Sequence, residues 1–155
     1  MALVLLLSVL IGVIAGLRTM MAPAAISWAA SLGWLNLAPT AVAFLGYRFA
    51  PWILSVLALG ELVTDQLPST PSRTVPIQFG ARIVSGGLCG AGIGAASGSL
   101  ITGAVGGVVG AVIGTLGGRA FRGWMATAFG SDRPAALIED AIAIVGALLI
   151  VAAAR

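Results

Sequence analysis

Apolar stretches long enough to cross a lipid bilayer recur from one end of this 155-residue chain to the other, and they restrict its fold more than any other feature. A transmembrane helix needs about 20 predominantly apolar residues. Here 59% of the residues are hydrophobic and 8% are charged, far fewer charges than a soluble domain carries. The sequence therefore predicts a single integral membrane domain over residues 1–155, with an all-α, polytopic fold.

The first apolar stretch, residues 2–33, is too long for one straight helix. At about 1.5 Å per residue it would measure roughly 48 Å, whereas the hydrocarbon core is roughly 30 Å thick. It must therefore break, tilt or turn back. Gly16 and Pro23 mark the favoured break, because they bracket Arg18, the single charge of the stretch. We predict five spans in total, or six if this segment is a re-entrant hairpin.

The later spans are placed by prolines, glycines and charges. Pro68 and Pro71 disfavour helix at the residues before them, so the helix that carries Glu61 is expected to end near Gln66. The remaining spans are predicted at about residues 40–63, 77–97, 100–116 and 132–154.

The arginines indicate an orientation. Two polar loops, 67–76 and 119–133, lie two crossings apart and therefore on the same side of the membrane. They carry Arg73, Arg119, Arg122 and Arg133. The positive-inside rule makes that side cytoplasmic in a bacterial inner membrane and places the C-terminus outside. The net charge of +3 does not indicate nucleic-acid binding, because the arginines are scattered singly through apolar sequence.

Two predicted spans carry glycine at every fourth position. The rows are Gly86, Gly90, Gly94 and Gly98 in the third span, and Gly106, Gly110, Gly114 and Gly118 in the fourth. Residues four apart share a helix face, so each row leaves a groove without side chains. In lipid such grooves let helix backbones approach closely. We therefore predict glycine-zipper packing of these spans, within the fold or in a homo-oligomer.

The few charges within apolar sequence form the candidate substrate- or ion-binding site. They are Arg18, Glu61, Asp65, Arg82, Glu139 and Asp140, with Arg73 and Arg119 as secondary candidates. Intramembrane ionisable residues are costly and mark functional sites by default. Asp65 lies in the last turn of its helix, where a carboxylate needs a cation nearby, and Arg73, Arg82 and Arg119 are the candidates. The set predicts either a polar cavity for a charged solute or a structural ion-pair network.

The missing residue types exclude several kinds of chemistry. The chain has no histidine and one cysteine, Cys89, which we interpret as a small packing residue. Intrachain disulfides, Cys/His zinc sites, histidine-ligated haem and Ser-His-Asp catalysis are therefore excluded. No metal, cofactor or enzymatic activity is expected. A carboxylate-and-arginine site acting on a lipid phosphate stays open, and an oxygen-only metal site is disfavoured because the arginines would compete for its carboxylates.

Three segments resemble a family of small bacterial membrane proteins, catalogued as domain of unknown function four-one-two-six. They are AGLRTMMAP at 15–23, GELVTDQLPSTPSRTVP at 60–76 and ARIVSGGLCGA at 81–91. The family pattern corresponds here to Gly16 and Arg18, Glu61, Asp65 and Pro68, Arg82, and Glu139 or Asp140. The resemblance implies that these polar residues form one recurring set, and it implies no activity.

Together these features predict a small channel or secondary transporter for a small ion or charged solute. Broken helix ends around Arg18 and a charged cavity near Glu61 and Glu139 would form its site. The alternative is a non-transporting protein, structural or lipid-binding, whose arginines hold anionic headgroups. The expected partners are membrane lipids, the solute and further copies of the same chain.

Overall fold

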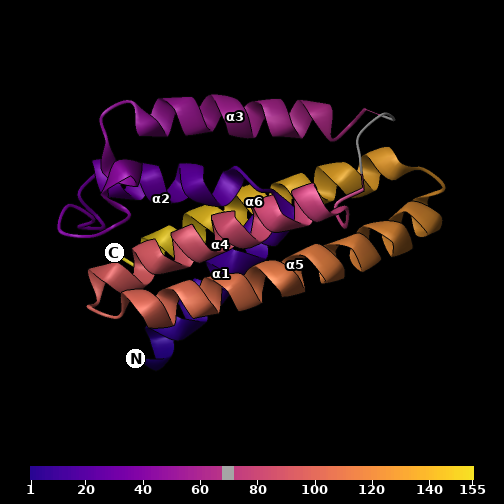
Figure 1. The fold of residues 1–155 in the computed structure, drawn as a ribbon. Helices are drawn as coiled ribbons and strands as arrows, with labels where there is room; N and C mark the ends of the chain where they lie inside the picture. The colour runs from indigo at the N-terminus through magenta and orange to yellow at the C-terminus, as the bar shows by residue number, and fades with distance from the viewer. Residues whose placement is uncertain (68–71) are drawn as a thin grey trace.

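The computed structural model of the protein describes residues 1–67 and 72–155, so Pro68 and Pro71 lie outside the described residues. The described part consists of helices and their connections, without a strand (Figure 1). Its elements are α1 (Ala2–Leu17), α2 (Met21–Ser31), the 3-10 helix η1 (Ala43–Gly46), α3 (Ala50–Thr64), α4 (Pro76–Ala96), α5 (Leu100–Phe129) and α6 (Asp132–Ala153). Helices α4, α5 and α6 are long and apolar enough to cross a membrane. The all-helical prediction is confirmed for these residues, and the architecture fits a helical membrane protein.

The first apolar stretch breaks between Gly16 and Pro23, at residues 18–20, and the chain reverses there (Figure 1). Helix α1 runs antiparallel to α4, since the Arg82 guanidinium donates to the Gly16 carbonyl and the Ser8 hydroxyl to the Gly90 carbonyl. Helix α2 then returns toward the end of the bundle from which α1 started. The break is therefore a reversal of direction rather than a kink.

This reversal lies inside the bundle, not at its surface. Gly16 packs against α5 at Ala111 and Thr115, whereas α5 continues for 14 further residues to Phe129 (129 − 115). At about 1.5 Å per residue, those residues extend roughly 21 Å beyond the reversal. The pair α1–α2 is thus a helical hairpin that enters from one end of the bundle and stops part of the way along it. That end also holds the C-terminus and the α4–α5 turn.

Glycines bring three helices into backbone contact. On one side of α5, Gly103 and Gly107 face α4, and a Cβ on Gly107 would overlap the carbonyl group of Gly86. On its other side α5 packs against α1, and a Cβ on Gly110 would overlap the Val9 carbonyl oxygen. Such contacts gain van der Waals energy that side chains would prevent. Helix α5 therefore uses two glycine faces at once, one for each neighbour.

The predicted glycine rows divide between these contacts. In the α4 row, Gly86, Gly90 and Gly94 face α5, whereas Gly98 lies in the following turn with φ +70° and no atom within 4 Å of its Cβ position. The α5 row packs against α1 instead of α4, and Gly118 at its end also approaches Arg73 and Glu139. The glycines that meet α4, Gly103 and Gly107, belong to a second row that was not predicted.

Two helix boundaries differ from the expected ones. Helix α5 does not end at Leu116, so most of the expected loop 119–133 is helix and ends at Gly130, whose left-handed φ of +68° is typical of a C-terminal glycine. No proline interrupts this segment, and glycine alone costs only about 1 kcal/mol in a helix. The expected span 40–63 is helical mainly from Ala50 onward, where Pro51 occupies the first turn.

Candidate functional site

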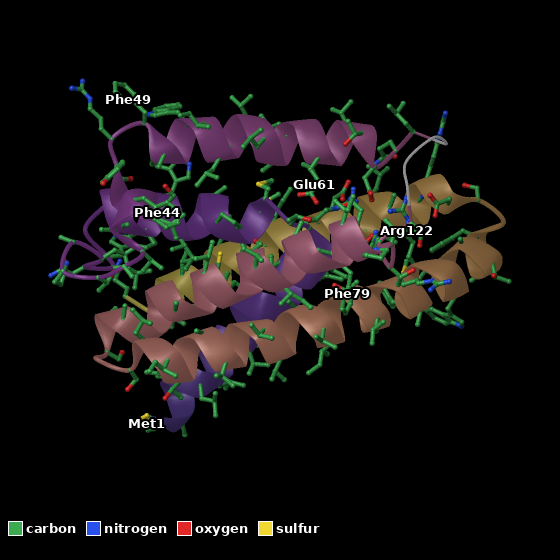
Figure 2. The ribbon with its side chains drawn as sticks, in the orientation of Figure 1. Met1, Phe44, Phe49, Glu61, Phe79 and Arg122 are labelled. Atoms are coloured by element: carbon green, nitrogen blue, oxygen red, sulfur yellow. The ribbon has the colours of Figure 1, made fainter. Side chains whose placement is uncertain are left out.

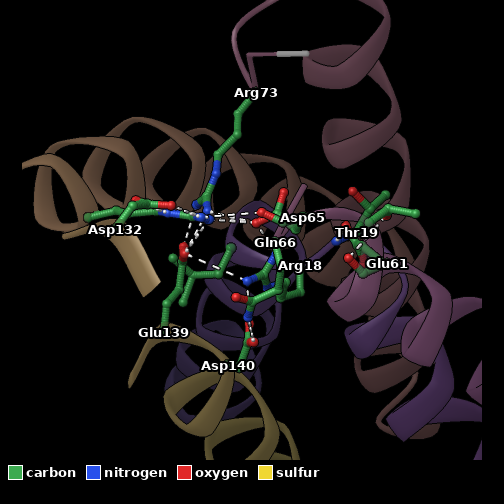
Figure 3. Close-up of polar contacts among 12 residues, drawn as sticks. Arg18, Thr19, Glu61, Asp65, Gln66, Arg73, Asp132, Glu139 and Asp140 are labelled. Atoms are coloured by element: carbon green, nitrogen blue, oxygen red, sulfur yellow. Dashed lines mark hydrogen bonds and ion pairs between the residues drawn. The ribbon is translucent and has the colours of Figure 1, made fainter. Parts of the chain in front are cut away.

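A network of ion pairs lies at the tip of the α1–α2 hairpin, with Arg18 at its centre (Figure 3). Arg18 follows the last residue of α1 and is fully buried. Its backbone is extended, with φ −137° and ψ 113°, because the helix ends there. Its guanidinium pairs with Asp65 after α3 and with Asp140 in α6, and lies 3.9 Å from Glu139. Arg18 therefore joins three elements that are distant in sequence.

Each of three arginines in the network can be assigned one carboxylate, although Glu139 also lies 3.9 Å from Arg18 and 3.5 Å from Arg122. These three framework pairs are Arg18–Asp140, Arg73–Glu139 and Arg122–Asp132. The last two are bidentate: Nη1 and Nη2 of Arg73 donate to Glu139, the second at 2.5 Å, and Nε and Nη2 of Arg122 donate to Asp132 at 2.9 and 2.6 Å. Bidentate guanidinium–carboxylate pairs fix both orientation and distance. The framework is neutral, with three charges of each sign.

Asp65 is shared among all three arginines of the framework. Its Oδ2 accepts from Arg18, from Arg122 Nη1 at 2.6 Å and from Arg73 Nη2 at 3.5 Å. Burial raises the pKa of the Asp65 carboxyl, but the Arg18 charge, the Arg122 hydrogen bond and the Arg73 charge together lower it below its usual 3.8. Asp65 is therefore ionised at neutral pH and adds one negative charge to the neutral framework.

A second group of charged residues, Glu61 and Arg82, forms hydrogen bonds with the backbone groups that the helix break leaves without helical partners. The Glu61 carboxylate accepts the N–H groups of Thr19 and Met20, at 2.7 and 2.8 Å, at the start of α2. Arg82 donates to the Gly16 and Leu17 carbonyls, at 2.7 and 2.8 Å, at the end of α1. Each charge thus meets the helix end of opposite partial charge. Glu61 and Arg82, which are 3.9 Å apart, hold the two ends of the broken helix in place.

These contacts predict a structural role for Glu61. Replacing Glu61 by Gln should lower the free energy of unfolding by about 1–2 kcal/mol, the usual value of an N-terminal cap, because an amide offers one acceptor oxygen to two N–H groups. Thermal unfolding in detergent, followed by tryptophan fluorescence, would measure the loss. Val63→Ala, two residues along α3 at a position that is 66% exposed, is the comparison variant. Equal stability of Glu61→Gln and wild type would contradict the capping role.

A cavity of about 700 Å³ opens beside the network at the end of the bundle where α5 and α6 meet. Its charged lining consists of Asp65, Arg73, Arg119, Arg122, Asp132 and Arg133. Arg119 donates to the Thr74 hydroxyl at 3.3 Å, and neither Arg119 nor Arg133 forms an ion pair among the residues that the structure describes. The cavity therefore joins the buried network to solvent through a lining with more arginines than carboxylates. Figure 2 shows Glu61 and Arg122 toward this end and Met1 and Phe49 toward the other.

The structure divides the predicted site residues into three sets. Arg18, Asp65, Glu139, Asp140 and the secondary candidate Arg73 belong to the network, Glu61 and Arg82 flank the helix break, and Arg119 lies at the cavity. Cys89 is fully buried in α4. Within residues 1–67 and 72–155, no three His, Cys, Asp or Glu side chains are grouped to hold a metal ion.

Two network members were not predicted as site residues. Arg122 and Asp132 were assigned to the loop 119–133, but α5 carries Arg122 back toward Asp65, and Asp132 begins α6 beside it. The spacing of Arg119 and Arg122 could have indicated a shared site, because residues three apart lie on the same helix face if the helix continues. Gln66 is a further neighbour, with Nε2 3.4 Å from Asp140 Oδ2.

Comparison with known proteins identifies no relative: no family model, no curated protein and no solved structure matches the chain. The function is therefore inferred from the geometry of the site.

Proposed function

We propose that this protein is a small membrane channel or secondary transporter that passes a small charged solute through the site around Arg18. The observation that carries the proposal is the helix reversal at residues 18–20, which places a fully buried arginine and its acidic partners beside a cavity of about 700 Å³. Helices that end within the membrane are a recurrent way to build solute sites in transporters, because their free backbone ends and nearby charges face a cavity.

The distribution of charged residues in the bundle supports this function. A buried charge is expensive in a membrane, and a chain with 8% charged residues places seven of its thirteen charges in one network (three arginines and four acids). The end that holds the cavity also holds Arg119 and Arg133, so we propose that it faces the cytoplasm of a bacterial cell. The termini would then face outward together.

Ion flux through purified protein tests the proposal. Proteoliposomes should give a current or tracer flux with at least one salt of a panel made of sodium chloride, potassium phosphate and sodium acetate. Arg122→Gln should reduce that flux at least about tenfold, because Arg122 links the cavity to Asp65 and its side chain is only 14% exposed. Arg48→Gln, at an exposed position at the opposite end, should leave it unchanged. Flux equal to that of protein-free liposomes for every salt would contradict transport.

One observation favours a second function, a non-transporting structural or lipid-binding membrane protein. Every carboxylate of the network is already paired with an arginine, which is also the arrangement of an ion-pair lock between helices. In that case Arg119 and Arg133 would hold anionic lipid headgroups. The flux assay separates the two functions, since this second one predicts that Arg122→Gln changes stability and lipid binding without any flux to lose.

A further inference from the structure

The point where three arginines converge on one carboxylate has the composition of an anion-binding site. Because Asp132, Glu139 and Asp140 already balance the charges of the three arginines, Asp65 is not needed to do so. We propose that this point binds a small oxyanion, such as a carboxylate or phosphate group, and that the Asp65 carboxylate occupies it until the oxyanion displaces it. This inference names the solute class for the transport function proposed above and rests on it.

The chemistry of the site selects for an oxyanion. Guanidinium groups offer planar, paired N–H donors that match carboxylate and phosphate oxygens. Arg18, Arg73 and Arg122 approach one point from the residue after α1, from the segment before α4 and from α5. A free cation placed at this point would lie directly against three guanidinium groups. The Asp65 Oδ2 atom shows directly that an oxyanion oxygen fits between them.

The cavity provides access to this point. Asp65, Arg73 and Arg122 all belong to its lining, whereas Arg18 is fully buried and does not line it, so a solute that enters from solvent reaches Asp65 and two of the three arginines without crossing the bundle. Arg119 and Arg133 line the same cavity outside the network. They would attract an incoming anion, and they offer a partner for the Asp65 carboxylate once it is displaced.

Asp65 follows the α-helix with the smallest share of buried residues in the described part of the chain. Only Pro51 and Ala58 are buried among the 15 residues of α3, which packs at the edge of the bundle against α2 and η1 (Figure 1). Asp65 comes just after this helix, four residues beyond Glu61, which holds α3 to the start of α2. A local movement after Glu61 would therefore release Asp65 while the contact between α3 and α2 stays intact.

Phosphate binding to an Asp65 variant tests this proposal. In neutral detergent, Asp65→Asn should bind inorganic phosphate at least about tenfold more tightly than wild type, because the competing internal carboxylate is gone. Asp132→Asn is the matched control: it removes the same charge from Arg122, but at a 59% exposed position that is not shared. Titration calorimetry at constant ionic strength, with sodium chloride as the balancing salt, would measure both affinities. Equal gains in the two variants, or no gain in Asp65→Asn, would overturn the proposal.

Two further experiments test whether the variant folds and whether the oxyanion comes from lipid or from solution. If Asp65→Asn does not fold in detergent alone, added phosphate should restore its melting transition, and failure of this rescue would overturn the site. If lipid headgroups supply the oxyanion, the variant should be more stable in nanodiscs of phosphatidylglycerol than in nanodiscs of phosphatidylcholine. If they do not, the variant should need added free phosphate to be stabilised in both kinds of nanodisc.

Binding and flux can fail separately. Phosphate binding without flux would keep the oxyanion site and remove the transport function. Flux of cations without any oxyanion binding would keep transport and remove the oxyanion site.

Discussion

Alanine at Gly107 should destabilise the protein by more than about 3 kcal/mol, at or above the upper end of what overpacking usually costs. The new Cβ would overlap the Gly86 carbonyl and lie 3.0 Å from the Gly90 Cα, and all of these atoms belong to helix backbones. Backbone cannot rotate aside as a side chain does, so α4 and α5 would have to separate along their shared length.

Gly117 provides the control for this substitution, because it lies ten residues further along the same helix with no atom within 4 Å of its Cβ position. Gly117→Ala should leave stability unchanged or raise it by up to about 1 kcal/mol, the gain in helix propensity. Thermal unfolding in the same detergent compares the two variants. Similar melting temperatures for both would mean that the two helices are not held by backbone contact at Gly107.

The second large effect is expected at Arg18. Arg18→Gln should destabilise the protein by about 3–5 kcal/mol, because it leaves buried carboxylates without their cation. Adding Asp140→Asn should recover much of the loss, since Asp140 has no other arginine partner among the described residues, whereas Asp65 keeps Arg122. Removing both members of a buried pair is often close to neutral.

A double-mutant cycle of these two substitutions, measured by thermal or denaturant unfolding, gives the coupling energy. Arg48→Gln, outside the network, serves as the additive control and should change stability by less than about 0.5 kcal/mol. A double variant that is as unstable as the sum of the two single ones would show that Arg18 and Asp140 are not coupled.

Much of the fold could be predicted from local sequence, because its strongest signals are local. The length of the first apolar stretch required a break, and Gly16, Arg18 and Pro23 located it to within a few residues. The predicted end of α5 was about four turns too early. Arg119 and Arg122 were assigned to a loop, whereas both lie on one continuous helix. A charged residue can end the apolar, membrane-spanning part of a helix without ending the helix itself.

The pairing of charges could not be predicted, because it depends on how helices pack. Arg73, Arg82 and Arg119 were equally good partners for Asp65 in the sequence. In the structure Arg73 reaches Asp65, but Arg82 is held by the Gly16 and Leu17 carbonyls and Arg119 by Thr74. The break in the helix creates free carbonyl groups, and these compete with carboxylates for the nearest arginine.

The short α1–α2 hairpin also determines where a membrane voltage would act. Voltage falls across regions of low dielectric constant and very little across water. If water fills the cavity as far as Asp65, the insulating layer is reduced to the depth that the hairpin and its neighbours occupy. A charge that passes from Arg18 to the opposite end then crosses most of the potential, an energy of about 2.3 kcal/mol per elementary charge at 100 mV. In that case the electric field would be concentrated on the layer next to the ion-pair network.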